Sequence, residues 1–150
     1  MESASPGKPI ARLKLPPEVE VLATVAVNSA FDVHRELGPG LLESSYEAAF
    51  VQELQSRRVD CRRQVPVPVI YKGLPIELGF RADVVLENKL LVELKAVEEI
   101  VPGHKARVIT YLKILNFPLG LLINFNEVLI KHGIQRVLNL GHRPINRFAS

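Results

Sequence analysis

Residues 82–95 read ADVVLENKLLVELK, and this stretch decides how the chain folds. Apolar residues dominate both halves of the stretch and flank the polar segment 87–89, so it predicts two β-strands joined by a tight turn. In the second strand Glu93 and Lys95 stand two residues apart and share one face, while the apolar residues on either side of Glu93 point to the other. A carboxylate and an ammonium group therefore stand within a strand that is otherwise suited to burial.

Asp83, in the first of these strands, should lie across from Glu93 and Lys95 if the turn is tight. Burying two carboxylates close together is unfavourable unless a cation neutralises them. Two carboxylates and a lysine on one sheet face are what a hard divalent ion and an activated water require. The alternative interpretation is a solvated pair on an edge strand, with Asp83 bonded to Arg81 or Lys95, and the spacing alone does not decide between the two.

The flanking sequence predicts helices before and after this sheet. Helical spacing of apolar residues follows Pro16 and Pro17 and ends at Gly38–Gly40, and a second helical segment begins at once, so a tight helical hairpin is expected. Pro66 and Pro68 place the first strand at an edge of the sheet. The expected elements, in chain order, are helices at 16–37 and 41–57, strands at 65–71, 78–86 and 90–96, a helix at 104–115 and a strand at 119–125.

This α-α-β-β-β-α-β order predicts an α/β fold with a mixed central β-sheet flanked by helices. The first three strands should form an antiparallel meander, and the strand at 119–125 should run parallel to its neighbour because a helical crossover precedes it. Residues 126–140 are interpreted as a further strand pair or as a short helix. The domain should span residues 16–140, with 1–15 as a flexible lead-in and 141–150 as a tail.

Size and composition narrow the class of protein. The chain has 150 residues, a formal net charge of +3 and one cysteine, Cys61. The length suits one domain with a substantial core, and one cysteine excludes an internal disulfide framework and a cysteine-based zinc cluster. We see no apolar run of membrane-spanning length and no signal peptide, so we expect a cytoplasmic protein with no membrane association. The charge permits a nucleic-acid partner without indicating one.

Asp83 and the triplet Glu93–Lys95 resemble the core motif of the PD-(D/E)XK nuclease superfamily. The segment GLLESSY at 40–46 resembles the motif that names one bacterial and archaeal branch, the GxxExxY proteins, and YKG, TYLK and PLGLLINFN also look like that branch. The resemblance covers most of residues 20–139. It implies a restriction-endonuclease-like core and a Mg²⁺- or Mn²⁺-dependent nuclease of little sequence specificity. Its nucleic-acid partner is then expected to be DNA rather than RNA.

The resemblance also implies roles for individual residues. Asp83, Glu93 and the backbone carbonyl of Leu94 would hold the metal, and Lys95 would position or activate the attacking water. Glu43, near the start of the second helix, would be an additional metal ligand or orienting acid. The alternative for Glu43 is that it serves only the positive end of that helix.

Three further residues are candidates for substrate binding or for support of the site. Tyr46 lies on the apolar stripe of its helix, where core packing with a hydroxyl partner is its default role. Arg107 stands one helical turn before Tyr111, where related nucleases often carry glutamine, and it could bind a phosphate or pair with Glu93. The second option would weaken metal binding and favours a catalytically idle nucleic-acid-binding or assembly module. A homodimer formed through the apolar strand Val65–Tyr71 is the third hypothesis.

Overall fold

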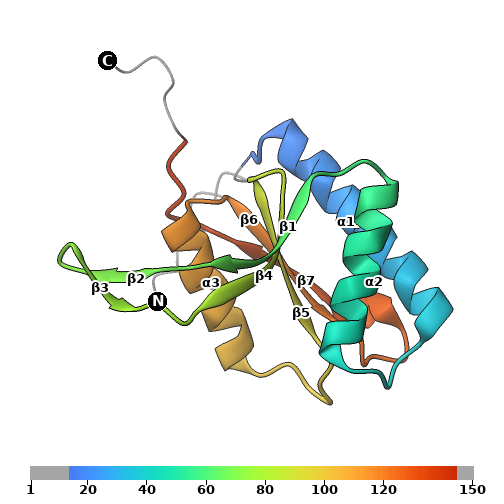
Figure 1. Cartoon of the computed structure of the whole chain (residues 1–150). Coiled ribbons are helices and arrows are strands. Elements are labelled where there is room, and N and C mark those ends of the chain that lie inside the picture. The colour runs from blue at the N-terminus through green and yellow to red at the C-terminus, as the bar shows by residue number, and fades with distance from the viewer. Residues whose placement is uncertain (1–13, 145–150) are drawn as a thin grey trace, which may run out of the picture.

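Five strands form a twisted central sheet in the order β1-β4-β5-β6-β7 within residues 14–144, the part of the chain that this computed structural model describes. Helices α1 (Pro17–Leu37) and α2 (Glu43–Ser56) cover one face and α3 (Pro102–Leu115) covers the other (Figure 1). The sheet strands are β1 (Cys61–Pro66), β4 (Arg81–Leu86), β5 (Leu90–Lys95), β6 (Leu119–Asn124) and β7 (Ile134–Leu138). This arrangement confirms the predicted α/β fold with a mixed sheet flanked by helices.

The order of strand directions also agrees with the prediction. β1, β4 and β5 are antiparallel, and the turn between β4 and β5 falls at Glu87–Lys89. β5 and β6 are parallel because α3 carries the chain back across the sheet. β7 pairs antiparallel with β6 and follows a short 3-10 helix, η1 (Ile130–Gly133), so residues 126–140 supply a short helix and one strand rather than a strand pair.

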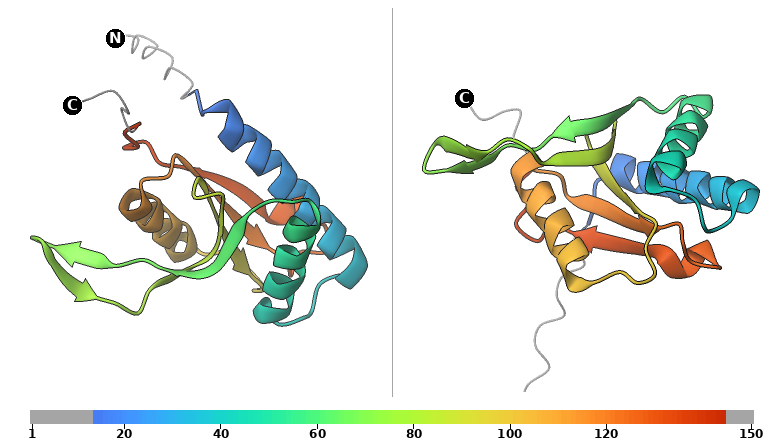
Figure 2. Two further views of the ribbon diagram at one scale, coloured as in Figure 1. Left: turned by 45° about the horizontal axis from the view of Figure 1, so that its top comes forward. Right: turned by 60° about the horizontal axis from the view of Figure 1, so that its bottom comes forward.

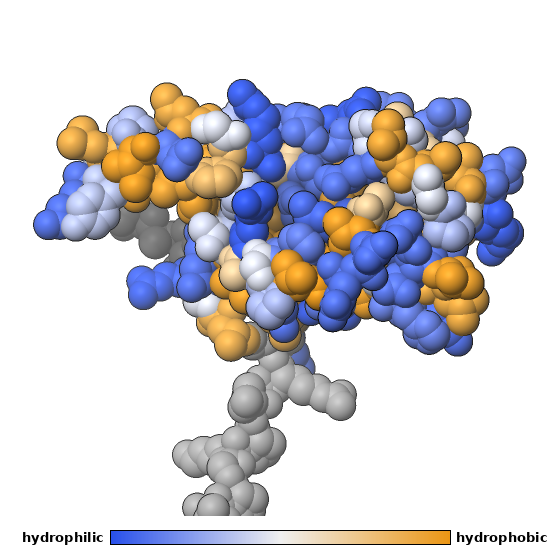
Figure 3. Space-filling view, turned by 90° about the horizontal axis from the view of Figure 1, so that it is seen from below, coloured by the Kyte–Doolittle hydropathy of each residue, from blue (hydrophilic) through white to orange (hydrophobic). Residues whose placement is uncertain are grey.

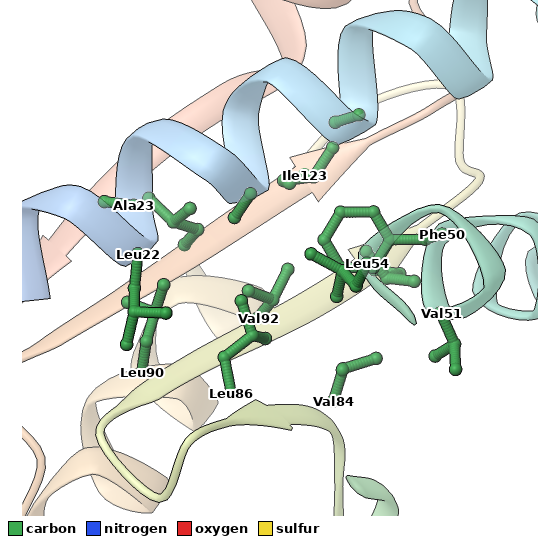
Figure 4. Close-up of a cluster of buried hydrophobic side chains, with 14 of the residues drawn as sticks. Leu22, Ala23, Phe50, Val51, Leu54, Val84, Leu86, Leu90, Val92 and Ile123 are labelled. Atoms are coloured by element: carbon green, nitrogen blue, oxygen red, sulfur yellow. The ribbon is translucent and has the colours of Figure 1, made fainter. Parts of the chain in front are cut away.

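Alternation along β4 and β5 builds two separate cores. Val84 and Val92 point toward α1 and α2, where they meet Leu22, Phe50 and other buried side chains (Figure 4). The intervening residues of both strands point toward α3 and form the second core. Since β5 is covered on both faces, its residues from Leu90 to Leu94 are at most 4 % exposed. A polar side chain in this strand must therefore find its partners inside the protein.

The first strand lies at an edge of the sheet, as predicted, but its predicted extent, Val65–Tyr71, is wrong because the chain leaves the sheet after Pro66. β1 ends at Pro66 and a separate hairpin follows, made of β2 (Val69–Tyr71) and β3 (Leu74–Glu77), which extends beyond the sheet (Figures 1 and 2). Pro66 and Pro68 both lack the backbone N–H that a continued ladder would need. The return strand expected from residue 78 correspondingly begins at Arg81.

The remaining expectations concern the ends of the chain and the membrane. Of the expected lead-in and tail, residues 1–13 and 145–150 lie outside the described residues, while 14–16 and 141–144 form no helix or strand. Among the helices that the structure describes, none combines the length and apolarity required to cross a bilayer.

Candidate functional site

The β4–β5 ladder changes character where the two acids stand. Backbone pairing is regular from Leu86 and Leu90 up to Val84 and Val92. One step further, the Asp83 N–H donates to Glu93 Oε1 at 2.9 Å, and the Leu94 N–H donates to Asp83 Oδ2 at 2.9 Å. The two carboxyl groups thus take the place of backbone acceptors between the strands. The structure brings Asp83 and Glu93 together as their spacing predicts.

Burial and mutual repulsion disfavour the charged forms of this pair. Glu93 is 4 % exposed, and burial, followed by the negative charge of Asp83, raises its pKa to about 8. Burial also raises the pKa of Asp83, against the opposing effect of the hydrogen bond from the Leu94 N–H. Lys95 favours the charged forms of both acids, but its effect is smaller than that of burial. At neutral pH Glu93 therefore retains a proton unless a further positive charge is present.

Lys95 lies at the end of β5, and its positive charge acts on both acids of this pair. Its side chain is half-buried, and its charge acts on Glu43 as well as on Asp83 and Glu93. The strand end is well anchored, since the Lys95 carbonyl accepts the Phe125 N–H at 2.8 Å. The neighbouring Asn124 is fully buried and bonds both backbone groups of Val97. These contacts fix the backbone from which the ammonium group extends.

Glu43 is contributed to this region by a helix rather than by the sheet, since it is the first residue of α2. Its side chain reaches the surface, yet neighbouring atoms shield the carboxylate enough to raise its pKa. Lys95 opposes this shift, while the charges of Asp83 and Glu47 add to it. The helix start of α2 thus brings a third acid within electrostatic reach of the strand ends.

Tyr46 fixes the junction between α1 and α2, which precedes Glu43. Its hydroxyl donates to the Gly38 carbonyl at 2.5 Å and accepts the Leu41 N–H at 3.1 Å. Its ring is fully buried and stacks on Phe125, with ring centroids 4.7 Å apart. The structure therefore places the Tyr46 hydroxyl at the helical junction, and no hydrogen bond joins it to the acids among the described residues.

Glu47 and Gln64 belong to the same region and were missed in the sequence. Glu47 is 7 % exposed; it accepts hydrogen bonds from Arg63 Nη2 at 2.9 Å and from Gln64 Nε2 at 2.6 Å. Gln64 Nε2 also lies 3.4 Å from Asp83 Oδ1. Gln64 has a φ of 50°, which is unfavourable for a residue other than glycine. Glu47 follows Glu43 by four residues and so shares its helix face, which was the available signal.

An aromatic and basic rim extends from the site along α3. The Arg107 guanidinium lies 5.8 Å from the centroid of the Phe80 ring, and Phe80 packs at an angle against Tyr111. Burial and the charge of Glu93 raise the pKa of Tyr111, while Arg107 opposes this. Within residues 14–144 Arg107 forms no ion pair, so it is not bonded to Glu93.

The donor atoms suit a hard divalent cation. Asp83 and Glu93 provide carboxylate oxygens, which Mg²⁺ and Mn²⁺ prefer, and a divalent charge would relieve their repulsion. Over residues 14–144 no group of three acid, histidine or cysteine side chains is already gathered as a metal site. The fit therefore rests on the carboxylate pair, with remaining ligand positions for water or backbone carbonyls.

Three comparisons with known proteins were made. A model of the PD-(D/E)XK nuclease superfamily matches residues 20–137 of the chain. No curated protein and no solved structure matches it. The matched segment contains every acid, lysine and arginine of the region described above.

Proposed function

The chain belongs to the PD-(D/E)XK nuclease superfamily, and on this premise we propose that it is a metal-dependent nuclease that hydrolyses phosphodiester bonds. The observation that carries the proposal is the pair formed by the half-buried Asp83 and the buried Glu93, with Lys95 beside it. The motif at 40–46 supports a place in the GxxExxY branch. DNA is the proposed substrate, and little sequence specificity is expected because we recognise no base-reading element.

In this proposal Mg²⁺ or Mn²⁺ is held by Asp83, Glu93 and the backbone carbonyl of Leu94, with Glu43 as a further ligand or orienting acid. When bound, such an ion supplies positive charge that stabilises the negative charge developing on the phosphate. The charged forms of both acids are disfavoured by burial and by their mutual repulsion, and a divalent charge would offset both effects.

The remaining steps belong to the chain's own side chains. The Lys95 ammonium donates a hydrogen bond that orients the attacking water, and its charge adds to the stabilisation of the phosphate. Glu43 can accept a hydrogen bond from the same water because it faces Lys95 and Asp83. Arg107 and Tyr111 on the rim are proposed to hold a neighbouring phosphate, for which the planar guanidinium is well shaped.

A second candidate is a nucleic-acid-binding protein of the same fold with no hydrolytic activity. The observation that favours it is the positive charge of Arg107. This charge opposes the rise in the pKa of Tyr111, a residue on which the charge of Glu93 also acts. Since Arg107 forms no ion pair within residues 14–144, its guanidinium is available to bind a backbone phosphate without a metal. Binding would then depend on backbone phosphates and weaken with salt.

The test is cleavage of labelled single-stranded, duplex and branched DNA and RNA with Mg²⁺ or Mn²⁺. Glu93→Gln and Lys95→Gln should each lower the rate by roughly 100-fold or more. Glu87→Gln and Lys89→Gln are matched controls, since both residues are exposed in the β4–β5 turn, and both should cleave normally. Thermal shift with Mn²⁺ gives a second readout, which Glu93→Gln should diminish.

Two results would contradict the nuclease. Cleavage that persists in both site variants would come from another group or another protein. Absence of cleavage by the wild type, together with nucleic-acid binding that is unaffected by chelator, would favour the second candidate.

A further inference from the structure

The hairpin of β2 and β3 is an arm that belongs to no other sheet. Within residues 14–144 its two strands pair with each other and with no strand of the five-stranded sheet. It continues from the ends of β1 and β4 and extends past the helices in each view (Figure 2). An isolated two-stranded hairpin is marginally stable in water, and three or more strands with an apolar face are normally needed.

The arm is strongly apolar for an exposed element. Five large apolar side chains within it or at its base are 58–70 % exposed: Ile70, Tyr71, Leu74, Ile76 and Leu78. Apolar residues gather at this end of the molecule in the space-filling view (Figure 3). Monomeric soluble proteins rarely leave contiguous patches of this kind uncovered.

Charge on the arm argues against nucleic acid as what covers it. Between residues 67 and 80 the charged side chains are Lys72 and Glu77, which cancel. The Lys72 ammonium lies over the ring of Tyr71, 5.4 Å from its centroid, at the tip. A phosphate backbone would require several lysine or arginine side chains along the contact. A neutral apolar surface suits another neutral apolar surface.

The two edges of the arm differ in their capacity to accept another strand. Lys72 and Gly73 form a two-residue turn with φ values of 48° and 80°, so the residues flanking the turn are the hydrogen-bonded pair. Backbone groups one step further, at Ile70 and Pro75, then point outward. Pro75 has no N–H and blocks the β3 edge, whereas Ile70 offers both a donor and an acceptor on the β2 edge.

We infer that β2 pairs with β2 of a second copy of this chain. In an antiparallel pair centred on Ile70, each Ile70 donates its N–H to the carbonyl of the other, as two-fold symmetry requires. The result is a four-stranded sheet in which Tyr71, Leu74 and Ile76, on one face of each arm by alternation, form a continuous apolar surface. Both copies contribute the same surface, the arm, to this interface. A neutral apolar arm can therefore pair with an identical arm without opposite charges on the two copies.

The size of the arm sets the expected strength of this contact. A standard interface uses about 20–30 residues on each side, and the arm from Pro68 to Phe80 contributes fewer than that. The dimer should therefore be reversible, with a dissociation constant in the micromolar range. The inference does not depend on the proposed nuclease activity, because neither metal nor substrate takes part.

Sedimentation velocity of the full chain without metal or nucleic acid, from about 1 to 200 µM, tests the inference. The wild type should shift from monomer to dimer over this range. Ile70→Lys should weaken association at least tenfold, and Ile70→Pro, which removes the outward N–H at the proposed two-fold axis without adding a charge, should weaken it as well. Val21→Lys is the matched control, since Val21 is 63 % exposed on α1, away from the arm.

Thermal unfolding of each variant should match the wild type at low concentration, which separates loss of association from loss of fold. A wild type that stays monomeric at the highest concentration overturns the inference. So does a dimer that persists in both Ile70 variants, because its interface then lies elsewhere. If the variants instead weaken DNA binding by a monomer, the arm contacts nucleic acid and the dimer is excluded.

Discussion

Glu47 on α2 and Glu93 on β5 are two carboxylates of nearly equal burial, at 7 % and 4 % exposed, with opposite surroundings. Glu47 accepts two hydrogen bonds from the positively charged Arg63 and one from the Gln64 amide. Glu93 faces a second carboxylate, Asp83, and among the described residues the hydrogen bond that it accepts comes from the Asp83 backbone N–H. The same residue type is therefore neutralised in one place and left uncompensated a short distance away.

The difference distinguishes a buried acid that has its own partners from an acid that we propose to bind a metal. A buried charge with its own partners stabilises the fold, whereas removal of one partner is strongly destabilising. A buried charge without a partner must keep a proton or attract a cation from solution. Glu47 thus ties α2 to β1, while the Asp83–Glu93 pair must either retain a proton or gain a cation.

The largest expected effect concerns the pH dependence of stability in metal-free protein. The pKa of Glu93 is raised from its ordinary value of 4.5 to about 8. Between pH 4.5 and 8 the unfolded chain has lost a proton that the folded chain retains. The contribution of Glu93 to the free energy of unfolding is therefore full below pH 4.5 and is lost as the pH rises through 8. Its size is on the order of 4 kcal/mol. Chemical denaturation in chelator from pH 5 to 8.5 should show stability falling.

Glu93→Gln is the comparison for this measurement, because the amide can accept from the Asp83 N–H without ionising. The variant should lose most of the fall and be more stable than the wild type at pH 8.5. Added Mg²⁺ should restore the wild type at that pH and have less effect on the variant. Equal pH profiles for the two proteins would mean that Glu93 is as well neutralised as Glu47.

Much of this site could be predicted from the sequence because strand alternation and a tight turn fix which residues meet. The turn at Glu87–Lys89 sets the register of β4 and β5, and the register brings Asp83 to Glu93. The parallel strand β6 was predictable for a similar reason, since an apolar run after a crossover helix has few other places in a sheet. These features depend on local spacing alone.

Features that depend on contacts distant in sequence were not predictable in this way. The alternation of Val65–Tyr71 favours one continuous strand, but β1 ends at Pro66 and the Val67 N–H donates to the Phe80 carbonyl at 2.9 Å, a distant contact that the alternation does not reveal. Glu47 was missed because its partners, Arg63 and Gln64, lie on β1, and the sequence does not specify how α2 packs on that strand. Its helical spacing from Glu43 was visible, but that spacing also suits a solvated helix face.

Glu47→Ala should produce the next largest change, a loss of about 2–3 kcal/mol in the free energy of unfolding. The substitution leaves the Arg63 guanidinium and the Gln64 amide without the carboxylate that accepts from both. Chemical denaturation at pH 7 measures it. Glu36→Ala on α1, where the glutamate is exposed, is the control and should change stability by less than about 0.5 kcal/mol. If the two variants are equally stable, Glu47 is not the structural member of the comparison.

Substitutions of Gln64 can separate two effects on stability, the hydrogen bond from its amide to Glu47 and the strain of its backbone conformation. Gln64→Ala should destabilise by about 1–2 kcal/mol, because the amide bond is lost while the φ of 50° remains unfavourable. Gln64→Gly loses the same bond but adopts that φ freely, so it should be about 1 kcal/mol more stable than the alanine variant. Thermal and chemical unfolding of the pair measure this difference. A glycine variant that is less stable than the alanine variant would show that β1 carries no such strain.

Glu43 is intermediate in its properties between Glu47 and Glu93, and its substitution should have the smallest effect on the free energy of unfolding. Its carboxylate reaches the surface and no hydrogen bond to it is present among the described residues, so Glu43→Gln should change stability by less than about 0.5 kcal/mol. The charges of Lys95 and Asp83 nevertheless act on it, and as a ligand or orienting acid it should strengthen Mn²⁺ binding. We expect roughly tenfold weaker Mn²⁺ binding by calorimetry in the variant. Unchanged Mn²⁺ affinity would assign Glu43 to the start of α2 alone. A stability loss as large as that of Glu47→Ala would make Glu43 a structural acid. In either case Asp83 and Glu93 would remain as the acids proposed to bind the ion.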